Sequence, residues 1–179
     1  MSKATMQGSM AEPISDWESF FIKDSMYIGE NDISRIFSYG LNSSPHNLLM
    51  LHYNMRSLTK NFGRLEEMLS LFPHMPDIVT ISETKLNAKA NLSSVQLPHY
   101  SFCHSPSRTL AGGVGIYINN ELDYKIRDDL KFVEEDNENI WIEILKTNST
   151  VNLNLQYLNN IIIGVIYRHP TSFIKNFIS

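Results

Sequence analysis

A carboxylate, Glu83, ends a run of apolar and β-branched residues at 78–82, and a lysine, Lys85, follows two positions later. A strand that is buried on both faces shows such a near-continuous apolar run, and ligand sites in α/β proteins gather where these strands stop. Carboxylate oxygens at such a place suit a hard cation such as magnesium. The sequence therefore predicts a cation site at Glu83. The simpler alternative is a solvated residue that follows a buried strand.

A second predicted strand, at 48–53, ends in the same way, because Asn54 follows it directly. Neighbouring strands can deliver the residues at their ends to one rim of a sheet, where ligand sites of α/β proteins lie. Asn54 is therefore a candidate partner of Glu83 at this rim. Its alternative role is that of a turn residue or a cap.

The segment between these two strands has the pattern of an amphipathic helix. Its apolar residues recur at helical spacing and form one stripe, namely Leu58, Phe62, Leu65, Met68, Leu69 and Phe72. Ser57 is the expected N-cap, and Pro73 is expected to end the helix. Residues 48–82 should thus form a β-α-β unit with parallel strands and a right-handed connection.

The rest of the chain predicts an irregular stretch followed by further strands. The irregular stretch covers 87–110, and strands are expected at 114–118, 140–145, 151–157 and 161–167. Short connections favour antiparallel pairing, so we expect mixed sheets with helices outside. Gly112 and Gly113 are interpreted as a tight turn into a strand, because the Lys-Ser/Thr pair of a phosphate-binding loop is missing.

Length and composition are those of one globular domain. The chain has 179 residues, of which 42% are hydrophobic and 11% aromatic, and this argues against disorder. Its net charge of −4 gives no overall cationic field, so any nucleic-acid binding would depend on a local surface. The single cysteine, Cys103, excludes an internal disulfide and suits a reducing compartment. Neither a signal peptide nor a membrane span is predicted.

The histidines offer no clear chemistry in the sequence. None of the six forms a convincing acid–base pair with a neighbour in the chain. His99, Cys103 and His104 lie close together in the sequence, but a zinc site needs further ligands and closer spacing. We therefore expect neither an acid–base pair nor a zinc site from these residues.

Four motifs occur in order along residues 47–177. They are Asn54 after one strand, Glu83-Thr84-Lys85 after a second, Gly112-Gly-Val-Gly-Ile116 before a third, and Tyr167-Arg-His-Pro170 after a fourth. In this order the chain resembles the endonuclease/exonuclease/phosphatase superfamily. The sequences Asn-Met-Arg-Ser-Leu, Ile-Ser-Glu-Thr-Lys-Leu and Gly-Val-Ile-Tyr-Arg-His-Pro look most like the apurinic/apyrimidinic-like endonuclease domain of non-LTR (LINE-type) retrotransposons.

The resemblance implies an α/β fold of the DNase I-like type, a four-layer α/β/β/α sandwich with the active site at one end of two packed sheets. It implies magnesium-dependent hydrolysis of DNA phosphodiesters, with Mn²⁺ as an alternative cation. Glu83 would be the metal-binding carboxylate, and Asn54 would orient the attacking water or the phosphate. Tyr167 would hydrogen-bond the scissile phosphate, and Lys85 would support the carboxylate or the phosphate. Without the resemblance, Tyr167 reads as a core tyrosine and Lys85 as a surface lysine.

The resemblance also implies a setting for the protein. DNA would be the partner of the complete parent protein, which would need neither a membrane nor an obligate protein partner. The parent would be intracellular and not secreted, and nuclear if it is a functional retrotransposon protein.

The chain departs from the family in what it lacks. Family members continue with Gly-Asp-x-Asn and Ser-Asp-His segments, which supply further carboxylates and a histidine, and residues 1–179 contain neither. We therefore expect 47–179 to be the N-terminal part of the domain, incomplete at its C-terminus and inactive as this fragment. Residues 1–46 would be an extension of uncertain order. The alternatives are a non-functional transposon relic or incomplete gene model, and a phosphatase or phospholipid phosphodiesterase of the same fold.

Overall fold

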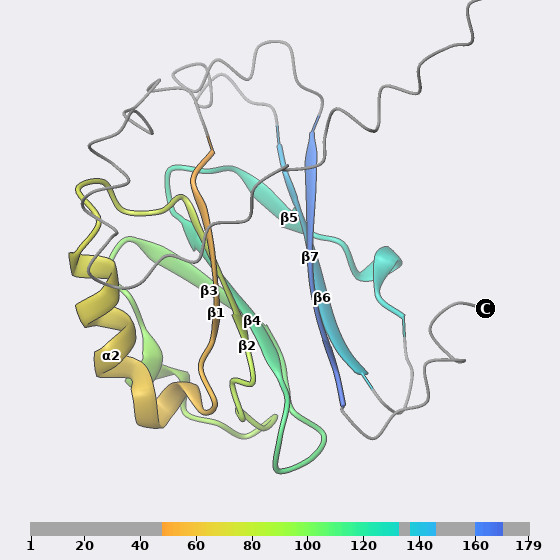
Figure 1. Ribbon diagram of the computed structural model, residues 1–179. Coiled ribbons are helices and arrows are strands. Elements are labelled where there is room, and N and C mark those ends of the chain that lie inside the picture. The colour runs from red at the N-terminus through yellow and green to blue at the C-terminus, as the bar shows by residue number, and fades with distance from the viewer. Residues whose placement is uncertain (1–47, 133–136, 146–159, 170–179) are drawn as a thin grey trace, which may run out of the picture.

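The computed structural model describes residues 48–132, 137–145 and 160–169 (Figure 1). Within these residues the chain is α/β, as predicted, with one α-helix beside two sheets. The first sheet has the order β1-β2-β4-β3, with bounds Met50–Asn54, Ile78–Ser82, Val114–Asn119 and Tyr100–Ser105 respectively. The second sheet has the order β5-β6-β7, with bounds Tyr124–Ile126, Asn137–Ile144 and Ile161–Arg168.

The predicted β-α-β unit is present. β1 and β2 are parallel neighbours, with Met50 opposite Ile78 and Asn54 opposite Ser82. The helix between them, α2, spans Leu58–Ser70. The parallel pairing is therefore confirmed, and it brings the ends of the two strands to one rim.

The apolar stripe of α2 packs on the first sheet as expected. Four of the six stripe residues are buried, and the other two are partly buried against the same cluster; the buried ones are Leu58, Leu65, Met68 and Leu69. The prediction for Ser57 is wrong in one respect, because its side chain makes no capping hydrogen bond. Its backbone has φ 126° and its N–H donates to Glu83 O at 2.9 Å, so contacts with the end of β2 fix this residue.

The central strands β2 and β4 are buried on both faces. On one face Val79, Ile81 and Tyr117 pack against α2. On the other face Ile78 and Ile116 pack against residues of β6 and β7 such as Ile142. Two clusters of apolar side chains therefore hold the first sheet between a helix and a second sheet.

Two strands lie where none was predicted. The stretch at 87–110 contains β3 and a 3-10 helix, η3, at Leu92–Val95, so it is not irregular throughout. The three-residue strand β5 was also missed; its burial is partial and its length too short to show a period. β6 begins at Asn137 and not at the predicted 140. Its first three residues, Asn137, Glu138 and Asn139, are polar although buried, so the search for an apolar run did not include them.

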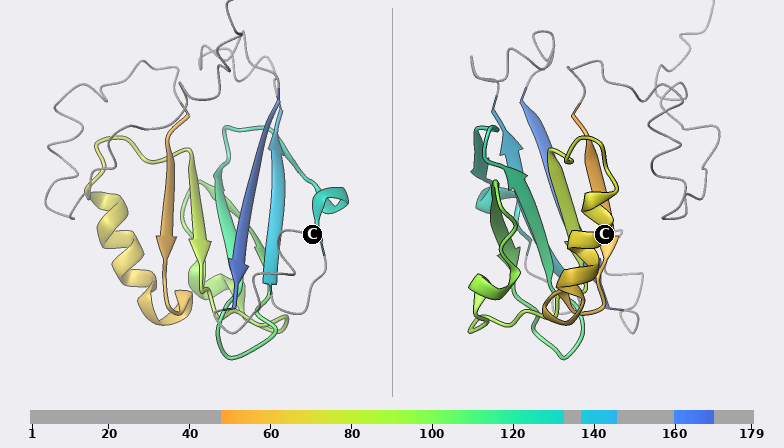
Figure 2. Two further views of the ribbon diagram at one scale, coloured as in Figure 1. Left: turned by 45° about the vertical axis from the view of Figure 1, so that its right-hand side comes forward. Right: turned by 90° about the vertical axis from the view of Figure 1, so that its left-hand side faces the viewer.

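The described residues form three layers, a helix and two facing sheets (Figure 2). A fourth layer, over the outer face of β5-β6-β7, is not part of the described residues, so the four-layer sandwich stays a prediction.

The short 3-10 helix η4, Asp128–Leu130, follows β5. None of the helices in the described ranges is long and apolar enough to span a membrane. The strand predicted at 151–157 and the extension at 1–46 lie outside the described residues.

Substitution of Gly164 tests the packing on the outer face of the second sheet, with Gly63 on α2 as the control position. The ring of Trp141 on β6 lies over Gly164 on β7, and a Cβ added there would overlap the ring carbons. Gly164→Ala should therefore lower the free energy of unfolding by about 1–3 kcal/mol through overpacking. Gly63→Ala is the control, because nothing lies within 4 Å of an added Cβ at this position in α2. That control should gain about 0.5–1 kcal/mol. Urea unfolding measures both, and equal effects of the two substitutions would contradict this packing.

Candidate active site

Asn54 and Glu83 meet at the rim where the parallel strands β1 and β2 end. Asn54 Nδ2 donates a hydrogen bond of 2.7 Å to Glu83 Oε1. The other end of the amide is also engaged, because Asn54 Oδ1 accepts from the backbone N–H of Arg56 at 3.2 Å. The Asn54 amide is thus fixed at both ends, and it orients the Glu83 carboxylate.

The backbone at Glu83 has an unusual conformation. Glu83 and Lys85 both have φ 53°, a left-handed value that is uncommon for residues other than glycine. Such conformations persist where the surrounding structure fixes them strongly. Two hydrogen bonds come from the start of α2, in which Ser57 and Leu58 donate to the carbonyls of Glu83 and Thr84, each at 2.9 Å.

Two more hydrogen bonds hold the segment Glu83–Lys85, called the Glu83 turn below, from the side opposite α2. Thr84 N donates to Gly113 O at 3.1 Å, and Lys85 N donates to Gly112 O at 2.8 Å. Gly112 and Gly113 have φ 96° and 78°, and they lead directly into β4. The glycines therefore lead into a strand as predicted, while the tight turn itself stays a prediction. The segment Gly112–Gly113, called the glycine turn below, offers two carbonyl oxygens to the residues that follow Glu83.

Tyr167 reaches the same region from the second sheet. β1, β2 and β7 run in the same direction and end at the same edge of the molecule (Figure 2). Burial and then the negative charges of Glu83 and Glu138 raise the pKa of Tyr167. A Cβ added at Gly112 would lie 3.0 Å from Tyr167 Cε1 and 2.7 Å from Glu138 Oε2, so Tyr167 and Glu138 meet at this glycine. The hydroxyl is a hydrogen-bond donor at neutral pH, as that of an ordinary tyrosine is, and the raised pKa extends this state to higher pH.

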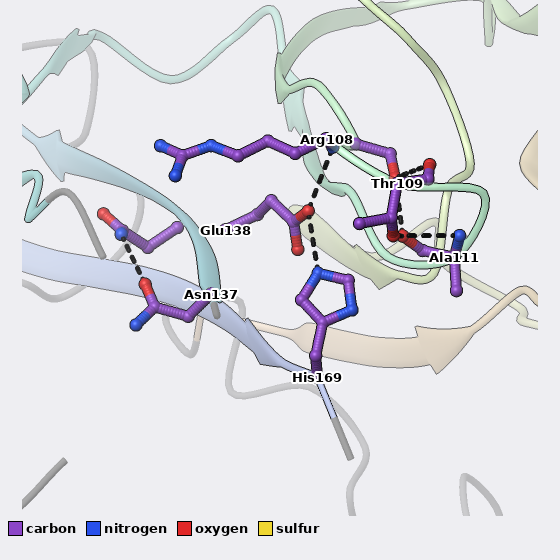
Figure 3. A network of polar contacts seen from close by, with 8 residues as sticks. Arg108, Thr109, Ala111, Asn137, Glu138 and His169 are labelled. Carbon is purple, nitrogen blue, oxygen red and sulfur yellow. Dashed lines mark hydrogen bonds and ion pairs between the residues drawn. The ribbon is translucent and has the colours of Figure 1, made fainter. Parts of the chain in front are cut away.

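Glu138 and His169 were missed by the sequence analysis. Glu138 Oε1 accepts a hydrogen bond from Arg108 N at 3.1 Å and lies 3.1 Å from His169 Nε2 (Figure 3). The sequence analysis did not anticipate this contact, because the two residues are 31 positions apart in the chain. The sequence contained one signal, which is that Glu138 lies two residues before the apolar residues of a strand, while Glu83 directly follows another strand.

The backbone of Lys85 is part of this site, while its side chain makes no contact among the described residues that defines it. Its N–H belongs to the Glu83 turn, while its side chain is exposed. The structure thus places Lys85 at the rim with Glu83 and Asn54. Its predicted support of a carboxylate or phosphate stays a prediction.

The donors at the rim suit a cation that keeps most of its water. In the described part of the chain no three His, Cys, Asp or Glu side chains are grouped as a metal site, including around His99, Cys103 and His104. Magnesium is commonly bound through one or two carboxylates, with water and substrate phosphate completing its shell. Glu83, with its carboxylate oriented by Asn54, fits that mode.

The glycine turn generates a prediction for the site. A Cβ at Gly113 would collide with Thr84 Oγ1 and lie 3.1 Å from Ser107 N, and φ at this position is positive. Gly113→Ala should therefore cost about 1–3 kcal/mol of stability. It should also shift the amide signals of Thr84 and Lys85 in a ¹H–¹⁵N correlation spectrum. Unchanged signals at these two amides would contradict the proposed contact between the turns.

Comparison with known proteins gives limited information about this site. No family model matches the chain, and no curated protein matches it. Among solved structures the chain is similar to the AP endonuclease LMAP from Leishmania major, with 25% sequence identity and a TM-score of 0.35. The similarity covers 44% of this chain and 26% of that one, so this chain spans about a quarter of the length of that enzyme. A likeness of this extent assigns the chain to no family.

Proposed function

We propose that this chain carries part of the active site of a magnesium-dependent DNA endonuclease. The observation that supports the proposal best is the hydrogen bond of 2.7 Å between Asn54 Nδ2 and Glu83 Oε1 at the ends of parallel strands. It presents an oriented carboxylate at the sheet rim where ligand sites of α/β proteins form. Tyr167 comes from the facing sheet, and the negative charge of Glu83 is one of the causes that raise its pKa.

Each residue has a separate role in this proposal. Glu83 would hold the divalent cation, Mg²⁺ or Mn²⁺, and Asn54 would keep the carboxylate in place and orient water or phosphate. When bound, such a cation offsets charge that develops on the phosphoryl oxygens. Tyr167 would donate its hydroxyl hydrogen bond to a phosphate oxygen, and Lys85 would support the carboxylate or the phosphate. Neutral donors suit this task, because they bind phosphate without competing for the cation.

The finer parts of the proposal rest on the motif resemblance. On that ground the parent would be a non-LTR retrotransposon protein that nicks DNA in the nucleus. Residues 47–179 would be the N-terminal part of its endonuclease domain. A phosphatase or phospholipid phosphodiesterase would share the rim chemistry and differ in substrate.

A non-catalytic relic of such a domain is the second candidate. It would keep the single oriented carboxylate of the rim, Glu83, without the chemistry of a complete site. In that case the rim would keep its geometry and bind a cation weakly, without hydrolysis. Activity measurements separate the two candidates.

The direct test is nicking of supercoiled plasmid by the complete parent protein, since residues 1–179 alone are expected to be inactive, with Mg²⁺ or Mn²⁺ and with and without EDTA. Glu83→Gln should lower the nicking rate at least about 100-fold, since cation stabilisation contributes several kcal/mol and each 1.36 kcal/mol is tenfold in rate. Glu67→Gln is a suitable control, because Glu67 is an exposed carboxylate on α2.

Full activity of Glu83→Gln would refute the role of Glu83. Absence of metal-dependent nicking by the unaltered parent protein would favour the relic. Hydrolysis of phospholipid vesicles in place of plasmid would redirect the proposal to a lipid substrate.

A further inference from the structure

Glu138 is a buried carboxylate whose position stability alone does not explain. Its side chain is 1% exposed, and its Oε2 has no hydrogen-bond partner among the described residues. Burial of a carboxylate is costly unless hydrogen bonds and opposite charge compensate it, and an unsatisfied oxygen adds to the cost. Unsatisfied buried polar groups in native proteins call for a specific explanation, and functional sites are one of the places where they occur.

The first connection runs from Glu138 to the backbone that follows Glu83. Glu138 Oε1 accepts from Arg108 N, at the start of the loop that ends in Gly112 and Gly113. An added Cβ on Gly112 would lie 2.7 Å from Glu138 Oε2, so this glycine sits directly on the carboxylate. The carbonyl of the same Gly112 accepts the hydrogen bond from Lys85 N. One loop therefore links Glu138 to the Glu83 turn.

The second connection runs from Glu138 to Tyr167. The two residues face each other across β6 and β7 in the antiparallel register. His169 Nε2 lies 3.1 Å from Glu138 Oε1, and its ring meets the Tyr167 ring edge-on, with 5.2 Å between centroids and an angle of 87°. The carboxylate thus fixes a histidine ring that in turn packs on Tyr167 (Figure 3 shows the Glu138–His169 contact).

We propose that Glu138 and His169 form a positioning pair that holds Glu83 and Tyr167 in one geometry. Glu138 anchors the 108–113 loop, which supports the turn at Glu83, and it holds His169 against Tyr167. The pair therefore joins the two sheets at the rim, because the loop belongs to the first sheet and Tyr167 to the second. This inference rests on the proposed function, in which Glu83 and Tyr167 act on the same phosphodiester.

The same strand provides a matched control for Glu138. Glu143 is a second buried carboxylate on β6, on the face away from Glu138. It binds Asn160 Nδ2 at 2.6 Å and pairs with Lys125 Nζ at 3.0 Å and Arg127. Glu143→Gln removes a paired, buried charge from the same strand and leaves the 108–113 loop untouched.

The first readout needs no metal. Amide hydrogen exchange of Thr84 and Lys85 in the full chain reports how firmly the Glu83 turn is held. Glu138→Gln should speed exchange at these two amides about tenfold, relative to the core amide of Ile116, because a charge-assisted acceptor is weakened. Glu143→Gln should leave that ratio unchanged. Equal ratios in both variants would overturn the proposal.

The second readout is the affinity for Mn²⁺ alone, measured by water-proton relaxation. Glu138→Gln should weaken it about tenfold, as is typical for partners that orient a metal ligand, and Glu143→Gln should not. His169→Phe keeps an aromatic ring beside Tyr167 but removes the nitrogen that contacts Glu138. It should weaken Mn²⁺ binding in the same direction as Glu138→Gln.

The combined outcomes separate the two proposals. If the exchange ratio changes as expected but the unaltered chain binds no Mn²⁺, the proposed function is wrong and the link between Glu138 and the Glu83 turn stands. If the unaltered chain binds Mn²⁺ at Glu83 and neither readout responds to Glu138→Gln, the positioning pair is wrong. If Glu138→Gln does not fold, His169→Phe provides the same comparison, and an unchanged Mn²⁺ affinity there overturns the pair.

Discussion

The two hydrogen bonds between the Glu83 turn and the glycine turn are the contacts on which the rim depends. Thr84 N and Lys85 N donate to the carbonyls of Gly113 and Gly112, just beyond the last β2–β4 pair, Ser82 with Val114. They extend the pairing past the ends of the strands and allow Glu83 and Lys85 to keep left-handed backbone angles. If the backbone were not fixed here, the Glu83 carboxylate would have no defined position in which to accept the hydrogen bond from Asn54. The chemistry at the rim is thus set by main-chain contacts between β2 and the start of β4.

The rim brings together segments that are far apart in the sequence. The parallel β1–β2 pair supplies Asn54 and Glu83, and β7 of the facing sheet supplies Tyr167. The apolar cluster between the two sheets, with Ile116 and Ile142 among its members, fixes the position of one sheet against the other. A buried carboxylate at Glu138 lies between them. An apolar residue in place of Glu138 would make the protein more stable. The buried carboxylate is consistent with a site that depends on the placement of Glu83 and Tyr167.

Much of the first sheet could be predicted from the sequence, because its local signals are strong. The apolar stripe of α2 and the continuous run of β2 have clear periods, and the end of each strand marked Asn54 and Glu83. β3 was missed because its sequence, Tyr-Ser-Phe-Cys-His-Ser, mixes aromatic with polar residues and lies in a stretch without a clear period. Glu138 was missed because Asn-Glu-Asn does not suggest a buried strand; only tertiary contacts make these polar residues part of β6. The left-handed turn at Glu83 was equally hidden, since it depends on carbonyls almost thirty residues away.

The most direct measurement of the central claim is a map of Mn²⁺-induced broadening in the ¹H–¹⁵N spectrum of the full chain. If Asn54, Glu83 and Tyr167 form one cation-binding site, their amide signals should broaden together at low Mn²⁺ concentration. The broadening should disappear in Glu83→Gln. Broadening centred on another acidic stretch, such as Asp128 and Asp129 after β5, with Asn54 and Tyr167 unaffected, would contradict the account.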